Sequence, residues 1–263
     1  YENTKAVIGD VFVAQRLTST PAAEVEARLL IHMIELLQNS PGIERIESQL
    51  LLHSVDAHRA IFEQTGFMIY PRLFMEQDLS SPSVTALPKS SRDGLALVRA
   101  VGLPEGLAIR PWNESDFVAV GRLIADAYDG HLDGLINDQY RTVSGSLRFL
   151  HNIVRFPGCG IFEAPASRVI YRRSTEQLAA VLLCSRVRDD VGHITQVCVA
   201  REFRRHGIAS LLLAAAAAEL RGRDFQILSL TVTEANANAV SLYRDRGFEA
   251  RHSFASMYWE HKK

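Results

Sequence analysis

The dipeptide Gly-Phe occurs twice in this chain, at residues 66–67 and 247–248, and similar segments precede the two copies. Each segment reads as a strand, a helix, a second strand and a short helix that ends at the glycine, with one more strand after it. The two halves of the chain are therefore predicted to be related α/β units. At the same spacing of 181 residues, Ile46 corresponds to Ile227, Ser48 to Ser229, and Phe62 to Tyr243.

A segment with the composition of a linker separates the two halves. Residues 81–106 contain three prolines and several serines, and such residues interrupt helices and strands. A chain of 263 residues is also longer than one small domain usually needs. The sequence therefore predicts a partial domain at residues 1–80, a linker at 81–106 and a full domain at 107–263.

Strand-like and helix-like segments alternate along the chain, which is typical of a mixed α/β fold. Capping residues mark several helix starts, such as Thr20 before Pro21 and Asn113 before an amphipathic run. The expected strands cover residues 7–13, 42–52, 68–79, 107–112, 160–163, 168–172, 178–187, 193–199, 227–232, 248–251 and 256–260. The expected helices cover residues 20–38, 56–66, 113–130, 135–154, 207–221 and 236–246.

Residues 201–210 read REFRRHGIAS and gather three arginines and a histidine between a strand and an apolar helix. The net charge of the whole chain is −1, so this positive charge is local and gives no reason to expect nucleic acid or a membrane as partner. A helix N-terminus offers unpaired N–H groups, and Gly207 lets the backbone approach a ligand closely. The turn is thus predicted to bind a phosphate group. A solvated basic turn is the alternative.

Two motifs resemble those of the GNAT superfamily of N-acetyltransferases. The family's acyl-CoA motif is Arg or Gln, two residues, Gly, one residue, then Gly or Ala, and here it reads Arg204-x-x-Gly207-x-Ala209. The family's second motif, N-x-x-A-x-x-L-Y followed by Gly-Phe, is matched from Asn236 through Tyr243 to residues 247–248. The resemblance covers residues 107–263, while the first half resembles the later part of a second, degenerate copy. It implies the GNAT fold, a central mixed sheet flanked by helices.

The resemblance also implies a function, the transfer of an acetyl group from acetyl-CoA directly to a primary amine. The pyrophosphate of the acyl donor would rest on the turn, and its pantetheine arm would run between diverging parallel strands at 193–199 and 227–232. A backbone N–H of Cys198 or Val199 would polarise the thioester carbonyl. The implied cofactor-binding residues are Val197, Val199, Arg204, Arg205, His206, Gly207, Ile208, Ala209 and Asn236.

Proton transfer needs a base for the amine and an acid for the departing thiolate. His193 lies where well-known family members carry a Glu or His base; the alternatives are a structural histidine, with water and backbone doing the work, or Glu163. Tyr243 matches the family's general-acid tyrosine, and a core tyrosine is the alternative. For Cys198, buried packing is favoured over a nucleophilic role.

Acceptor selection is expected from the first helices of the second half and their loop. Carboxylates there would favour a cationic amine, although a solvated polar loop fits equally well. The partner would be a small-molecule or peptide amine, and a homodimer fits the family. The loop residues are Asp129, His131, Asp133 and Asp138.

The first half departs from the family pattern and is expected to lack catalysis. At the 181-residue spacing, Arg204, Gly207 and Ala209 are replaced, and Phe62 stands for Tyr243 and has no proton to give. Acidic residues in the first turn of its helix would repel phosphate. The replacing residues are Ala23, Glu26 and Arg28.

Two rival functions remain open from the sequence. One is a non-catalytic acyl-CoA sensor or regulatory pseudoenzyme, and the other is transfer to a thiol or hydroxyl from the same donor site. Three cysteines without a CxxC pair or zinc spacing favour a reduced, cytoplasmic setting and give no metal site.

Overall fold

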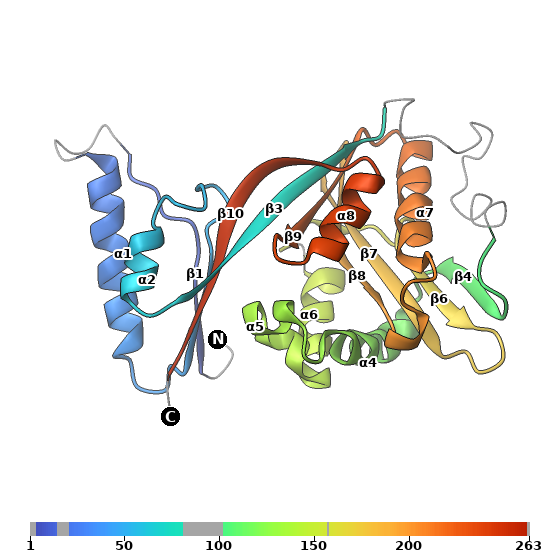
Figure 1. Cartoon of the computed structure of the whole chain (residues 1–263), viewed down its shortest axis with the longest axis horizontal. Helices are drawn as coiled ribbons and strands as arrows, with labels where there is room; N and C mark the ends of the chain where they lie inside the picture. The colour runs from blue at the N-terminus through green and yellow to red at the C-terminus, as the bar shows by residue number, and fades with distance from the viewer. Residues whose placement is uncertain (1–3, 15–20, 81–101, 157, 262–263) are drawn as a thin grey trace. The chain divides into compact units, whose positions relative to one another are not determined.

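The chain folds into two compact units that each combine strands with helices (Figure 1). The computed structural model describes residues 4–14, 21–80, 102–156 and 158–261. In this part of the chain no helix is long and apolar enough to cross a membrane. Unit 1 contains Tyr1–Phe74, Val232–Asn236 and Arg251–Lys263, and unit 2 contains Met75–Thr231 and Ala237–Ala250.

This division differs from the expected domain boundaries at both ends of the second half. Residues 75–80 belong to unit 2, and residues 251–263 belong to unit 1. The cause at the C-terminus is strand pairing, because residues 256–260 of β10 (Glu249–Glu260) pair antiparallel with β2 (Arg45–Gln49). Residues 81–101, most of the expected linker, lie outside the described residues.

Unit 1 is a small sheet with two helices beside it; in Figure 1 the helices are blue and cyan, and the strand β10 of this sheet is red. The strand order is β1-β2-β10-β3, and β1 and β2 run parallel with Ile8 opposite Ser48. Leu30, Ile34 and Phe62 of the helices are fully buried in its core. Its own elements are β1 (Lys5–Ile8), α1 (Ala22–Gln38), β2, α2 (Arg59–Gln64) and β3 (Met68–Asp78).

Unit 2 is built on strands in the order β9-β8-β7-β6-β4, with β5 paired to β7. β8 and β9 run parallel, and the other pairs are antiparallel, so the sheet is mixed as expected. The elements are β4 (Leu107–Pro111), η3 (Glu114–Asp116), α4 (Phe117–Tyr128), α5 (Leu132–Ile136), η4 (Asp138–Arg141), α6 (Val143–Arg155), β5 (Ile161–Phe162), β6 (Arg168–Arg172), β7 (Leu178–Arg188), β8 (Val191–Val199), η5 (Arg201–Phe203), α7 (Ile208–Gly222), β9 (Ile227–Thr233) and α8 (Ala237–Asp245).

Helices cover both faces of the unit 2 sheet. Val181 and Leu183 of β7 join the apolar cluster that contains residues of α4. Cys184 points to the opposite face, because successive side chains alternate along a strand. There a Cβ at Gly192 would lie 2.7 Å from Leu220 of α7 and 3.4 Å from the Cys184 sulfur. Glycine at residue 192 thus lets α7 pack closely on the sheet.

The predicted repeat is present in the order of the elements. β1, α1, β2, α2 and β3 of the first half match β8, α7, β9, α8 and β10 of the second. Both copies pair their first two strands in parallel, and Ile8 opposite Ser48 in unit 1 corresponds to His193 opposite Ser229 in unit 2. The first copy therefore carries an apolar residue at the place of His193.

Three expected elements differ from the structure. The strand expected at residues 7–13 is instead β1 at Lys5–Ile8, because its pairing with β2 covers only these four residues and residues 9–14 form no strand. The helix expected at 135–154 is divided among α5, η4 and α6, because Asn137 and Thr142 cap new helices by accepting the N–H groups of Gln139 and Gly145. The two strands expected at 248–251 and 256–260 form the single strand β10.

Candidate functional site

The parallel strands β8 and β9 of unit 2 separate halfway along their length. Their pairing runs from Val191 opposite Ile227 to Ile194 opposite Leu230 and goes no further, although β8 continues to Val199. The structure therefore has the diverging strand pair that the sequence predicted.

A bulge in β8 explains why the strands diverge at this point. On the β7 side, Cys184 pairs with Ile194 and Leu183 pairs with Gln196, so Thr195 is one residue too many. A β-bulge bends and twists the strand that carries it. The bend begins directly after the last β8–β9 pair and turns the following residues, Gln196 to Val199, away from β9.

The arginine-rich turn connects the end of β8 to α7. Gly207 is the N-cap of α7 with φ +74°, a left-handed conformation that favours glycine. Arg205 is also left-handed, with φ +68°. A Cβ at Gly207 would have no heavy atom within 4 Å, so the space beside this glycine is open.

The backbone of the turn offers a row of hydrogen-bond donors. No described residue accepts a hydrogen bond from the N–H groups of residues 205–210, and the first bond of the helix runs from the Leu211 N–H to the Gly207 carbonyl at 3.0 Å. Such N–H groups carry the positive end of the helix dipole. Together with the open space at Gly207, they fit a phosphate-bearing ligand.

The basic side chains of the turn have different roles. The Arg204 guanidinium donates to the carbonyls of Val199 at 3.1 Å and Ala127 at 2.8 Å, so it ties the end of β8 to the end of α4. His206 bonds through Nδ1 to the Arg204 carbonyl at 2.8 Å. Arg205 and His206 are exposed, whereas Ile208 is buried and anchors the helix start. Ala209 is half-buried in the first turn.

A polar network that the sequence analysis missed lies where β8 leaves β9. The side-chain oxygen of Gln196 accepts hydrogen bonds from the Tyr128 hydroxyl and from the Val197 N–H, both at 2.9 Å. Gln196 is 4% exposed, and its Nε2 has no hydrogen-bond partner among the described residues. Because the Val197 N–H can only donate, the oxygen must face it, and Nε2 is the group left over. Tyr128 and Gln196 are 68 positions apart in the sequence, so no local motif could indicate that they form a hydrogen bond.

The two backbone positions predicted to pair with pantetheine are both engaged within the chain. Val197 uses its N–H for Gln196, and Val199 uses its carbonyl for Arg204. Pairing of a ligand with the Val197 N–H therefore requires the Gln196 side chain to give up one of its two donors.

Tyr243 lies on α8, buried at 7% exposure. Its ring packs edge-on against Phe248 with 5.8 Å between the centroids. Tyr243 is also close enough to Tyr128 to influence it: burial, followed by the charges of Tyr140, Asp133, Cys198 and Tyr243, raises the pKa of Tyr128 well above its ordinary value. Tyr243, Tyr128 and Cys198 thus gather in one region of unit 2.

His193 lies on β8 before the bulge, half-buried between its strand neighbours. Its Nδ1 is 2.9 Å from the Ser229 hydroxyl, and that hydroxyl donates to the Gly192 carbonyl at 3.2 Å. The hydroxyl has one proton, so it accepts from Nδ1–H, and Nε2 carries the lone pair. This tautomer suits a base that acts through Nε2.

Glu163, the weaker base candidate, has a structural partner. Its carboxylate accepts from Arg223 at 2.6 Å, and the side chain is buried. Arg223 is the C-cap of α7, whose 15 residues place it about 22 Å from the phosphate-type site at the other end. This geometry favours a role in fastening α7 over a role as a base.

The acceptor-loop residues are mostly engaged locally. Asp129 pairs with Arg201 at 3.0 Å, an exposed ion pair. His131 accepts the Asp133 N–H through Nδ1 at 3.1 Å and caps α5, and Asp138 begins η4. Asn236, predicted to bind the cofactor, directly precedes α8 and belongs to unit 1.

Both buried cysteines should make the protein sensitive to alkali. Burial raises the pKa of Cys184 and of Cys198 from 9.0 to about 12. Their contribution to stability is complete below pH 9, where both states are protonated, and it is lost as the pH rises towards 12. Each cysteine should lower the free energy of unfolding by about 1.4 kcal/mol per pH unit in this window.

Urea unfolding of the wild type and of Cys198→Ala between pH 9 and 11 measures this effect. In the variant, the decrease in the free energy of unfolding per pH unit that the two thiols cause should be about half as large as in the wild type. A packing defect would instead lower the free energy of unfolding equally at every pH. Parallel pH profiles for the two proteins would contradict a raised pKa at Cys198.

Comparison with known proteins agrees with this geometry. The model of the acetyltransferase (GNAT) family matches residues 135–248, and no curated protein sequence matches the chain. Many solved structures share the fold at low identity, and three of them are described next.

A GCN5-related N-acetyltransferase from Sphaerobacter thermophilus is 19% identical with a TM-score of 0.56, over 82% of this chain and 59% of that one. A tandem GNAT protein from the clavulanic acid biosynthesis pathway is 15% identical with a TM-score of 0.55, over 90% and 70%. A GCN5-related glucosamine N-acetyltransferase region of a fungal multi-domain β-N-acetylglucosaminidase is 14% identical with a TM-score of 0.61, over 94% and 29%. The chain thus spans less than two thirds of the first and third of these proteins.

The diverging strands β8 and β9 and the turn at Gly207 lie within the residues that the family model matches. The tandem protein, which has the same fold, supports the reading of the first half as a degenerate copy. Residues 135–248 therefore resemble the acetyltransferase (GNAT) family, and the fold of the chain agrees with that resemblance.

Proposed function

We propose that unit 2 transfers an acetyl group from acetyl-CoA to a primary amine of a small molecule or peptide. The observation that carries this proposal is the turn at Gly207, where the N–H groups of residues 205–210 have no acceptor among the described residues and the adjacent space is open. A phosphate group satisfies these donors and complements the helix dipole.

The donor's pantetheine arm fits the opening between β8 and β9. Beyond Ile194 the two strands no longer pair, so an extended chain between them gains backbone hydrogen bonds as an added strand would. Gln196 contributes one further donor, its buried Nε2. This group suits a carbonyl oxygen of the bound donor or acceptor, because burial makes an unsatisfied amide N–H costly.

In the reaction, the amine nitrogen attacks the thioester carbonyl, a C–N bond forms and the C–S bond breaks. His193 Nε2 takes the proton from the amine, directly or through a water molecule, while Ser229 and Gly192 hold the ring in the required tautomer. Tyr243 gives its hydroxyl proton to the departing thiolate. The proton moves from the phenol oxygen to the thiolate sulfur, so that CoA leaves as a neutral thiol.

One acetyl-CoA should bind per chain. In unit 1 the N-cap of α1 is Pro21, with φ −53°, and it has neither an N–H group nor the left-handed conformation of Gly207. Glu24 adds negative charge to the first turn, which disfavours phosphate there.

Calorimetric titration with acetyl-CoA and a turnover assay against a panel of primary amines test these points together. We expect a stoichiometry near one, and at 100 times the dissociation constant a stabilisation of about 2.7 kcal/mol. A stoichiometry of two would contradict the single site. Tight binding without turnover on any amine, thiol or hydroxyl acceptor would favour the acyl-CoA sensor instead.

A further inference from the structure

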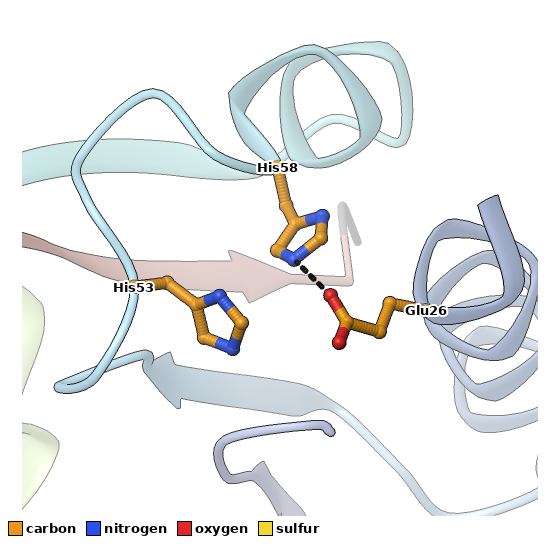
Figure 2. Close-up of side chains that lie close together, drawn as sticks. All are labelled: Glu26, His53 and His58. Carbon is orange, nitrogen blue, oxygen red and sulfur yellow. Dashed lines mark ion pairs between the residues drawn. The ribbon is translucent and has the colours of Figure 1, made fainter. Parts of the chain in front are cut away.

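Three side chains of unit 1 meet in a cluster that the proposed function does not use. Glu26 of α1, His53 of the loop after β2 and His58 at the start of α2 point into a common space (Figure 2). Each offers one oxygen or nitrogen atom, and these atoms all lie within 4.8 Å of one another. From this cluster we propose that unit 1 contains a binding site for a divalent transition-metal ion, Zn²⁺ by its chemistry.

The atoms that would not face the metal are held by the backbone. Glu26 accepts the Val13 N–H through Oε1 at 3.3 Å, which leaves Oε2 towards His58. His53 bonds through Nε2 to the Val11 carbonyl at 3.0 Å, so Nε2 carries the proton and Nδ1 the lone pair. A histidine that ligates a metal commonly donates its other N–H to a backbone carbonyl in this way.

His58 supplies the third ligand and an unsatisfied polar atom. The residue is 8% exposed, and its Nε2 is buried without a hydrogen-bond partner among the described residues. The nearest carboxylate oxygen, Glu26 Oε2, is 3.7 Å away, which is too long for a hydrogen bond. A metal ion between these atoms would satisfy Nε2, and burial makes that satisfaction valuable.

The rings are also positioned by their neighbours. Phe12 stacks on His53 with 5.2 Å between the centroids and 18° between the planes. His58 meets His53 edge-on at 5.0 Å. The imidazoles are thus oriented by packing as well as by hydrogen bonds, which limits the side-chain rotation that a metal would have to impose.

The donor set decides which ion fits. Two imidazoles and one carboxylate are ligands that Zn²⁺ accepts, with a water molecule as the fourth, whereas Mg²⁺ and Ca²⁺ prefer oxygen alone. Bonds of about 2.0–2.1 Å in a tetrahedral site place ligand atoms about 3.3 Å apart. The three ligand atoms are at present up to 4.8 Å apart. Small side-chain rotations would bring them to the spacing that a bound Zn²⁺ requires.

An ion at this place would join three segments that are distant in the sequence. Glu26 lies in a helix, His53 in a loop, and His58 directly before the next helix, with the segment of Val11 and Val13 attached through the two backbone bonds. The loop from residue 50 to residue 58 contains turns but no regular element. Zn²⁺ would therefore fasten this loop to α1 and stabilise unit 1.

The test uses tag-free full-length protein, freed of metal with a chelator and titrated with Zn²⁺ by calorimetry. We expect one saturable Zn²⁺ per chain, a higher melting temperature with Zn²⁺, and with Co²⁺ a visible absorption band of tetrahedral intensity. Glu26→Gln and His53→Ala should each weaken Zn²⁺ binding by about 100-fold or more and remove the Co²⁺ band.

His32→Ala is the matched control, because His32 is an exposed histidine of the same helix α1 and does not belong to the cluster. It should bind Zn²⁺ as the wild type does. Glu26→Gln keeps the size of the side chain and an oxygen for the Val13 N–H, and circular dichroism of the metal-free variant verifies that it folds. Absence of saturable binding to the wild type, or Zn²⁺ binding that survives both substitutions, would overturn the site. Acetyl-CoA affinity is a separate readout, so either proposal can fail without the other.

Discussion

Replacing Gly207 by glutamate is expected to weaken acetyl-CoA binding by at least about 100-fold. The residue has φ +74°, and a side chain there would project into the open space beside the N–H groups of residues 205–210. A carboxylate in that space would occupy donors intended for phosphate and repel its charge. The loss of two charge-assisted hydrogen bonds corresponds to about 3–6 kcal/mol, or roughly a 10²-fold to 10⁴-fold change in affinity.

Calorimetry of wild type, Gly207→Glu and a control variant measures this change. Gly106→Glu is a suitable control, since Gly106 also has a positive φ of +79°, open space around its Cβ position and a place in unit 2. The Gly106→Glu variant has the same backbone strain and the same added charge, but in the turn before β4. Equal losses of affinity in the two variants would point to global destabilisation, and unchanged affinity in Gly207→Glu would place the donor elsewhere.

Changing Tyr243 to phenylalanine should lower turnover by about 10²-fold to 10⁴-fold while acetyl-CoA affinity changes little. General acid catalysis contributes on this scale, and a group that acts on the leaving thiolate stabilises mainly the transition state. Only the hydroxyl oxygen is removed. Unit 1 has the same arrangement with phenylalanine, because Phe62 packs edge-on against Phe67 at 5.0 Å as Tyr243 packs against Phe248 at 5.8 Å.

Steady-state kinetics with a responsive amine, together with a direct measurement of acetyl-CoA affinity, separates the roles of Tyr243. Tyr171→Phe serves as the control, because this substitution also removes a single phenol hydroxyl. Tyr171 lies on β6, with its ring beneath the Arg110 guanidinium. Undiminished turnover in Tyr243→Phe would make this tyrosine a packing residue. Parallel losses of affinity and turnover would identify a ligand contact instead.

Local features of the fold followed from the sequence. The turn at Gly207, the helix after it and the capping box at Asn113 each depend on residues within a few positions of one another. Backbone conformation and capping bonds act over such short distances. The repeat could also be predicted from a local signal. Gly-Phe at residues 66–67 and 247–248 follows equivalent short helices in the two copies.

Spacing misjudged the elements whose boundaries depend on distant partners. The end of the chain was assigned to the second half, but β2 of the first half provides the pairing edge for residues 256–260. A strand gains its hydrogen bonds only from a neighbour, and the sequence of the strand does not say which neighbour that is. The same limit applies to residues 135–154, where helical periodicity concealed the caps at Asn137 and Thr142.

The sequence by itself determined that a glycine-containing turn follows a strand and precedes an apolar helix in the second half, and it predicted roles for that turn, Tyr243 and His193. Only the tertiary structure decided how side chains far apart in the chain combine. It assigned the Arg204 guanidinium to two carbonyls, one of them in α4, joined Tyr128 to Gln196, and brought Glu26, His53 and His58 together. The physical reason is that local conformation is set by neighbouring residues, whereas a network or a metal site depends on the packing of whole elements.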